Sequence, residues 1–226
     1  MSDILSVVIP SYNSSAYIAE ALESVLGQGC ESTLEILVVD DGSQDNTAEI
    51  VTQFPEVHYI QTEHGGAGSA RNKGVAAAHG NLVAFLDADD IWSRGKLTLQ
   101  LSAMRSDPSL DMVFGHVEEF LAPGIQDEET SKLRKYSPGY VPGTLLIKKE
   151  SFERVGHFDG NWRVGEFVDW YIRSMELNLK AQLLKEVVLK RRIHGNNLGR
   201  RERGSLGDYA RILKAALDRR KALVTN

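Results

Sequence analysis

The sequence predicts an α/β protein in which helices flank a mostly parallel central sheet. Short apolar runs alternate with helix-like segments at least four times, an order typical of parallel sheets. Two of these runs end in aspartate clusters, and a third is followed by a tyrosine. Parallel strands bring their carboxyl ends to one edge, where such sheets bind ligands, so these polar ends indicate one shared site.

Size and composition agree with one folded domain over residues 1–226. The chain is 42% hydrophobic and 25% charged, with no internal repeat or linker. No apolar run approaches the roughly 18 residues of a membrane span, and the N-terminus lacks a signal-peptide pattern, so we expect a cytoplasmic protein. The single cysteine, Cys30, has no partner for an internal disulfide.

Charge is unevenly distributed along the chain. The formal net charge of -5 argues against nucleic-acid binding, yet residues 190–203 carry six lysines and arginines against one glutamate. A basic segment in an acidic protein suits an anion, which is either a phosphate group or an anionic membrane surface. A solvated loop is the alternative interpretation.

The first predicted element is a strand over 4–10, and a helix over 14–27 follows it. Pro10, Tyr12 and Asn13 therefore stand at the carboxyl end of the first strand, where a ligand is expected. Helix capping by Asn13 and packing of the aromatic ring would also explain this segment.

The second strand, over 34–39, ends in Asp40 and Asp41. A tight turn and a helix that runs to about residue 54 follow, and residues 57–61 form a third strand. A carboxylate at such a strand end can accept hydrogen bonds from a nucleotide base or ribose.

A glycine-rich segment, 65–68, precedes a helix over 69–78 that contains Arg71. Backbone N–H groups at the start of this helix can meet an anion. The spacing matches neither a Walker A sequence nor a dinucleotide fingerprint, so the segment alone is a weak signal.

The chain is organised around residues 82–92, "LVAFLDADDIW". A buried strand over 82–86 delivers Asp87, Asp89 and Asp90 to its tip. Carboxylates crowded there repel one another and lose hydration, and Mg²⁺ or Mn²⁺ would offset both effects with oxygen ligands. The alternative is a solvated turn that caps the next helix, over 94–104.

The second half of the chain combines strands and helices. We expect strands over 111–121, 140–149 and 182–188, helices over 149–155, 166–177 and 209–223, and a loop over 122–140. In the second of these helices Glu166 and Asp169 share one face, which nominates a general base. The alternative is a favourable placement of acids at a helix N-terminus.

Four segments in order, "VVIPSYN", "LVVDDGSQDNT", "GGAGSARNKGVAAAHGNLVAFLDADDIW" and "GHFDGNWRVGEFVDWYIRS", resemble the successive signatures of family 2 glycosyltransferases of the GT-A fold. The likeness runs to about residue 198. It implies a nucleotide-binding half over 1–92, a half for acceptor and metal over 93–204, and a C-terminal helix over 205–226.

The resemblance also implies roles for single residues. Asp89 and His194 would hold Mn²⁺ or Mg²⁺, and the arginines near the C-terminus would neutralise the diphosphate. The donor pocket would contain Pro10, Tyr12, Asn13, Asp40, Arg71, Asp87 and Ala88, and the diphosphate would meet Arg191, Arg192, Arg200 and Arg201.

The chain departs from the family pattern at one position. The aspartate usually taken as the base would fall at position 167, which is Phe167 here. Either Asp169, our first choice, or Glu166 takes over as base, or the enzyme is compromised. The implied reaction is an inverting displacement by an acceptor hydroxyl on a nucleotide sugar.

The expected partners are a nucleotide-sugar donor, with UDP-sugar first, and a carbohydrate, lipid-linked or other hydroxyl acceptor. Nucleic acid is not expected, whereas peripheral contact with the inner face of a membrane and a homodimer stay open. Two other functions compete with this interpretation. A nucleotidyltransferase is disfavoured because no basic Gly-rich loop follows the first strand. The second is a non-catalytic member of the family that binds nucleotide sugar or a partner.

Overall fold

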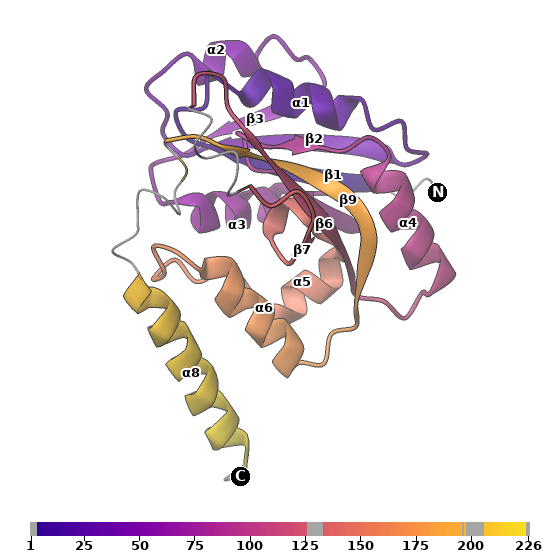
Figure 1. Ribbon diagram of the computed structural model, residues 1–226, viewed down its shortest axis with the longest axis vertical. Coiled ribbons are helices and arrows are strands. Elements are labelled where there is room, and N and C mark those ends of the chain that lie inside the picture. Colours follow the sequence, from indigo (N-terminus) through magenta and orange to yellow (C-terminus); the bar gives the residue numbers. More distant parts are fainter. Residues whose placement is uncertain (1–3, 126–132, 196, 198–205, 225–226) are drawn as a thin grey trace.

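The computed structural model describes residues 4–125, 133–195, 197 and 206–224 (Figure 1). Its centre is a nine-stranded sheet with the order β3-β2-β1-β4-β8-β6-β9-β5, in which β7 pairs with β6. The strands are β1 (Ile4–Ser11), β2 (Thr33–Asp40), β3 (Val57–Gln61), β4 (Leu82–Phe85), β5 (Ile91–Trp92), β6 (Met112–Leu121), β7 (Ser137–Gly139), β8 (Leu146–Lys148) and β9 (Ala181–Ile193).

Helices cover both faces of this sheet. They are α1 (Ile18–Leu26), α2 (Thr47–Val51), α3 (Ala67–Ala77), α4 (Lys96–Ser106), the 3-10 helix η2 (Pro142–Thr144), α5 (Lys149–Val155), α6 (Glu166–Glu176) and α8 (Leu206–Val224). One apolar core joins the sheet to α1, α2 and α4, and a second, rich in aromatic rings, joins it to α3, α5 and α6. Figure 1 shows α1 and α2 on one side of the sheet, with α3, α5 and α6 on the other.

The topology confirms the α/β fold that the sequence predicts. Strands β1 to β4 form a parallel block, because β1 pairs in parallel with β2 and β4, and β2 with β3. The sheet continues through β8, which is antiparallel to β4 and β6, and β9 returns parallel to β6. The carboxyl ends of β2, β1 and β4 therefore lie side by side.

Close packing holds α3 against the parallel block. A Cβ atom on Gly74 would lie 2.2 Å from Cγ1 of Val8 on β1, which is much shorter than any carbon contact. Glycine at this position lets the helix axis approach the sheet. Arg71 stands one turn earlier on α3, and its side chain is buried next to the sheet.

Several element boundaries differ from the expectations. Helix α1 begins at Ile18 and not at residue 14, because the N–H groups of Ser14 and Ser15 donate to Thr47 and Asp45 instead. Strand β9 extends to Ile193, five residues beyond the predicted end, and η2 replaces the start of the strand predicted over 140–149. Among the described residues, no helix combines the length and apolar character needed to cross a membrane.

Candidate functional site

The polar ends of β1, β2 and β4 meet at the carboxyl edge of the parallel block. Asp40 is the last residue of β2, Tyr12 follows β1, and Asp87 follows β4 by two residues. Since β1 lies between the other two strands, these side chains occupy neighbouring positions along the edge. Pro10 is buried inside β1, and Ala88 is 5% exposed beneath the edge.

Asp40 is almost completely buried, and both of its carboxylate oxygens accept hydrogen bonds. The N–H of Ser43 donates to Oδ1 at 2.8 Å, and the hydroxyl of Tyr59 donates to Oδ2. Burial and the neighbouring Asp40 carboxylate together raise the pKa of Tyr59, so this phenol stays a donor. A carboxylate has about four acceptor positions, and these two hydrogen bonds occupy two of them.

The adjacent Asp41 has a structural role that the sequence does not predict. Its oxygens accept from the N–H groups of Gly65 and Gly66, each at 2.8 Å. Nδ1 of His64 also lies 2.8 Å from Oδ2. Asp41 therefore anchors the glycine-rich segment at the start of α3. The only signal in the sequence is the Asp40-Asp41 doublet itself.

Two aromatic rings form the open rim of this edge. Tyr12 is 45% exposed, and its ring centroid lies 4.5 Å from that of His64. Asn13, by contrast, is bound to the protein, because its Oδ1 accepts from the N–H of Gln44 at 2.8 Å. Tyr12 therefore lies at the surface, whereas Asn13 joins the loop after β1 to the loop after β2.

Arg71 links the parallel block to α6. Its Nη2 donates to Asp87 at 2.6 Å, and its Nη1 donates to Glu166 at 2.8 Å. Burial alone would lower the pKa of Arg71, but the two carboxylates outweigh burial and raise it, so the guanidinium stays charged. Two predicted site residues from distant parts of the chain are thus brought together by a third.

The aspartate turn after β4 is crowded with negative charge. Asp89 lies 2.8 Å from Nε2 of His194 and accepts from Nδ2 of Asn197 at 3.3 Å. Burial and the nearby Asp87 raise the pKa of Asp89, whereas His194 acts in the opposite direction. The pKa of Asp90 is raised well above its ordinary value by burial and by its two acidic neighbours.

The two side chains assigned to a metal ion, Asp89 and His194, therefore lie in direct contact. Across the ranges that the structure describes, no group of three or more His, Cys, Asp or Glu side chains is arranged to hold a metal ion. The described part of the protein offers two such side chains at this point, together with the amide of Asn197.

The arginines expected to meet a diphosphate separate into three groups. Arg192 is buried, and its Nε donates to the carbonyl of Asp89 at 2.9 Å. Arg191 points away, with Nη1 3.8 Å from Glu119, because neighbouring residues of a strand face opposite sides. Arg200 and Arg201 lie outside the described residues.

The candidate bases on α6 have different surroundings. Glu166 lies against Arg71, whereas Asp169 is 3% exposed and pairs with Arg173 at 2.9 Å and with Arg219 of α8 at 3.4 Å. Asp169 is thus occupied in joining α6 to α8. Phe167 is buried in the second core, where its ring packs on Phe114, Phe158, Trp170 and Tyr171.

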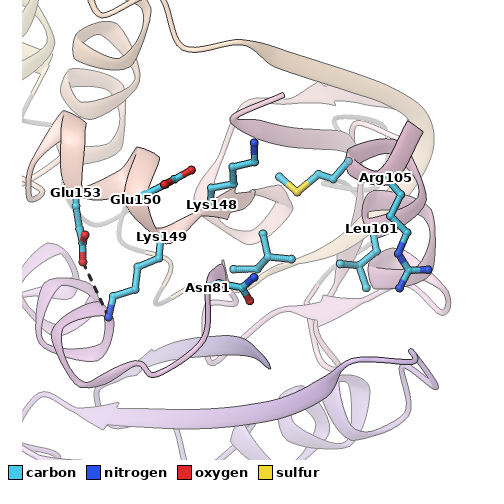
Figure 2. A pocket seen from close by; sticks show the side chains of 9 residues that line it. Asn81, Leu101, Arg105, Lys148, Lys149, Glu150 and Glu153 are labelled. Atoms are coloured by element: carbon cyan, nitrogen blue, oxygen red, sulfur yellow. Dashed lines mark ion pairs between the residues drawn. The ribbon is translucent and has the colours of Figure 1, made fainter. Parts of the chain in front are cut away.

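A cavity of about 460 Å³ lies at the opposite edge of the sheet, near the start of β4 (Figure 2). Its basic side chains already have partners. Nζ of Lys149 donates to the carbonyl of Ala78 at 2.6 Å, and Nζ of Lys148 donates to that of Pro108 at 2.7 Å. Because the cavity is remote from the aspartate turn and its cations are satisfied, we assign it no part in the site.

Comparison with known proteins identifies relatives of this chain. An uncharacterized glycosyltransferase of Nostoc sp. (strain PCC 7120) is 33% identical over 214 residues, which cover 85% of this chain and 66% of the relative. Escherichia coli WfgD, a UDP-Glc:alpha-D-GlcNAc-diphosphoundecaprenol beta-1,3-glucosyltransferase, is 37% identical over 118 residues, which cover 51% of this chain and 46% of WfgD. The chain thus spans about two thirds or less of these relatives.

Solved structures of S. aureus TarS share the fold. The complex with UDP superimposes with a TM-score of 0.73 at 21% identity, covering 96% of this chain and 64% of that one. The complex with UDP-GlcNAc gives 0.70 at 22% identity, covering 87% and 60%.

The fold is therefore of the GT-A type, and the acid-rich edge lies at the carboxyl ends of its parallel strands, where open α/β sheets bind ligands. Residues 6–164 match the family model described as glycosyl transferase family 2, so the chain belongs to this family. The match ends before α6, and the choice of a base rests on local geometry alone.

Proposed function

We propose that this chain transfers a sugar from a nucleotide-sugar donor, a UDP-sugar, to an acceptor hydroxyl with inversion at the anomeric carbon. The observation that carries the proposal is the bridge through Arg71, which holds Asp87 of the donor edge and Glu166 of α6 within one hydrogen-bonded unit. A donor-binding carboxylate and a candidate base are thereby kept at a fixed separation.

The nucleoside would bind at the rim formed by Tyr12 and His64. An exposed aromatic ring can stack on a base, and Asp40 retains acceptor capacity for an N–H or a ribose hydroxyl. TarS, which has this fold, is known in complexes with UDP and UDP-GlcNAc, and this supports uridine as the first nucleoside to test.

The donor set at the aspartate turn fits Mg²⁺ or Mn²⁺. Such ions take one or two protein carboxylates and complete their shell with phosphate oxygens and water. Asp89, whose pKa is raised by burial and by Asp87, gains from a nearby cation, and His194 would be the second protein ligand. A bound ion would supply positive charge for the diphosphate, next to Arg192.

We propose Glu166 as the general base, ahead of Asp169. Glu166 faces the donor edge through Arg71, while Asp169 is buried between two arginines and has no comparable access to an acceptor. Phe167, at the position where the family pattern has its base, is buried in the core, so we propose that the base comes from a neighbouring residue of α6.

The chemical step then follows. Glu166 accepts the proton of the acceptor hydroxyl, and the oxygen forms a bond to the anomeric carbon as the bond to the diphosphate breaks on the opposite face. The leaving group departs with additional negative charge. Arg71 keeps the Glu166 carboxylate oriented throughout.

For the acceptor we propose a lipid-linked sugar that is met on the cytoplasmic side of a membrane. Support comes from the name of WfgD, whose acceptor is a diphosphoundecaprenol-linked sugar. The donor specificity and the acceptor of this chain are separate questions, because each depends on its own few hydrogen bonds.

Calorimetric titration with UDP, and with GDP and dTDP as controls, tests the donor site directly. We expect UDP binding in Mn²⁺ that is lost in excess chelator and in Asp89→Ala. Transfer from UDP-sugars to a lipid-linked sugar then tests the activity. A folded protein that binds none of the three nucleotides would refute the proposal and favour a non-catalytic role.

A further inference from the structure

Helix α8 carries an apolar stripe that the described part of the protein leaves about half exposed. Tyr209, Leu213 and Leu217 recur at intervals of four residues and are 42%, 58% and 56% exposed. Residues with this spacing share one face of a helix. Figure 1 shows α8 extending away from the sheet, so the stripe is carried on a projecting element.

The other face of α8 is fixed to α6. Ile212 and Ala216 are buried there, and Nε of Arg219 donates to Glu176 at 2.8 Å while its Nη1 lies 3.4 Å from Asp169. A Cβ on Gly165 would lie 2.9 Å from Cδ1 of Ile212, so the helix packs closely at its first turns. The stripe cannot turn inward without breaking these contacts.

The stripe lies in the basic part of an acidic protein. Residues 206–224, which form α8, contain five lysines and arginines against two aspartates, whereas the whole chain has 26 basic residues against 31 acidic ones. On α8 itself, the exposed Lys214 follows Leu213 and the exposed Asp218 follows Leu217. Arg220 is 63% exposed at its side chain, with its Nε 3.9 Å from Glu176. Positive charge therefore borders the apolar stripe.

We propose that α8 docks on the surface of an anionic lipid bilayer. The stripe would enter the boundary between headgroups and acyl chains, and the basic side chains would meet acidic headgroups. A second copy of the chain is a poorer occupant, because a stable interface buries about 800 Å² per partner and two basic helices repel each other. Docking goes beyond sugar transfer, although it would also hold the site at a lipid surface.

Vesicle sedimentation tests this docking without any nucleotide, so its result is independent of the proposed reaction. We expect the protein to bind vesicles of phosphatidylcholine with 30% phosphatidylglycerol, and to stay unbound with phosphatidylcholine alone. Leu213→Glu with Leu217→Glu should weaken binding at least about tenfold, since two apolar side chains are lost from the interface. Leu99→Glu, at a 39% exposed leucine of α4, is the matched control and should leave binding unchanged.

Leu213→Ala with Leu217→Ala provides a second test, because alanine preserves the helix. Its binding should fall in the same direction, with an unchanged thermal unfolding midpoint. Equal binding by the variants and the parent protein, or no binding to anionic vesicles, would overturn the proposal. A dimer in light scattering that the alanine variant converts to monomer would also overturn it and assign the stripe to a second copy.

Discussion

The guanidinium of Arg71 donates to the carboxylate of Glu166 at 2.8 Å, although the two residues are 95 positions apart in sequence. This single contact joins the half of the chain that would bind the donor to the helix that would act on the acceptor. The proposal of Glu166 as the general base rests on this contact, and the first prediction tests that proposal.

Glu166→Gln should abolish most turnover and spare donor binding. The amide still accepts from Arg71 but cannot take a proton, so we expect kcat to fall about 100-fold to 10,000-fold. The dissociation constant for UDP should change by less than about threefold. Glu153→Gln, at a 63% exposed side chain of α5, serves as the control in the same transfer assay. Turnover within threefold of the parent would exclude Glu166 as the base.

Asp169→Ala should act on stability first. It leaves Arg173 and the partly exposed Arg219 without their shared carboxylate, and losing one partner of a buried pair costs about 3 kcal/mol in the free energy of unfolding. Urea denaturation measures this loss, and Asp218→Ala, at an exposed position of α8, should change it by less than about 0.5 kcal/mol. If Asp169→Ala unfolded with the same free energy as the parent, the role of Asp169 in joining α6 to α8 would be contradicted.

Gly74→Ala should destabilise the protein although alanine is the better helix former. The added methyl would lie 2.2 Å from Val8, and overpacking of this kind costs about 1 to 3 kcal/mol. Gly207→Ala is the matched control, because a Cβ there meets nothing within 4 Å. We expect the thermal midpoint to fall for the first variant and to hold or rise for the second. A higher thermal midpoint in both variants would show that α3 can move away from β1 without loss of stability.

Lys96 gives the stability a pH dependence. Its ammonium is fully buried and donates to Gln100 at 2.6 Å, and burial holds its pKa well below the ordinary 10.5. Between the folded pKa and 10.5 the unfolded chain binds a proton that the folded chain lacks, so this residue makes stability increase with pH.

Lys96→Met should remove that contribution. We expect the difference in unfolding free energy between the parent and the variant to move in favour of the parent as pH rises towards 10.5. Chemical denaturation at a series of pH values measures it. A difference that stays constant over this range would mean that Lys96 is protonated in the folded protein.

The strands of the parallel block could be predicted because each is a buried apolar run that ends in polar residues. The end of β9 could not, since Lys190, Arg191 and Arg192 read as a loop although they pair with Glu118, Glu119 and Phe120. Such basic residues fit a strand only when acidic and aromatic partners from another strand lie beside them, and that pairing is not visible locally.

The candidate site divides in the same way. Asp40, Asp87 and Asp89 could be found because strand ends gather at one edge of a parallel sheet. The role of Arg71 depends on a contact with α6, which no spacing rule connects to α3. The burial of Phe167 likewise depends on rings from β6 and the segment before α6.

Asp40 and Asp41 are chemically identical neighbours, yet one holds Tyr59 and the other holds the backbone of Gly65 and Gly66. The two aspartates have different partners because their side chains point to opposite sides of the chain. Deleting one residue from β2 would exchange their directions and break both attachments while leaving the acidic composition of the edge intact. At this edge the position of each residue along β2 therefore matters as much as its chemical identity.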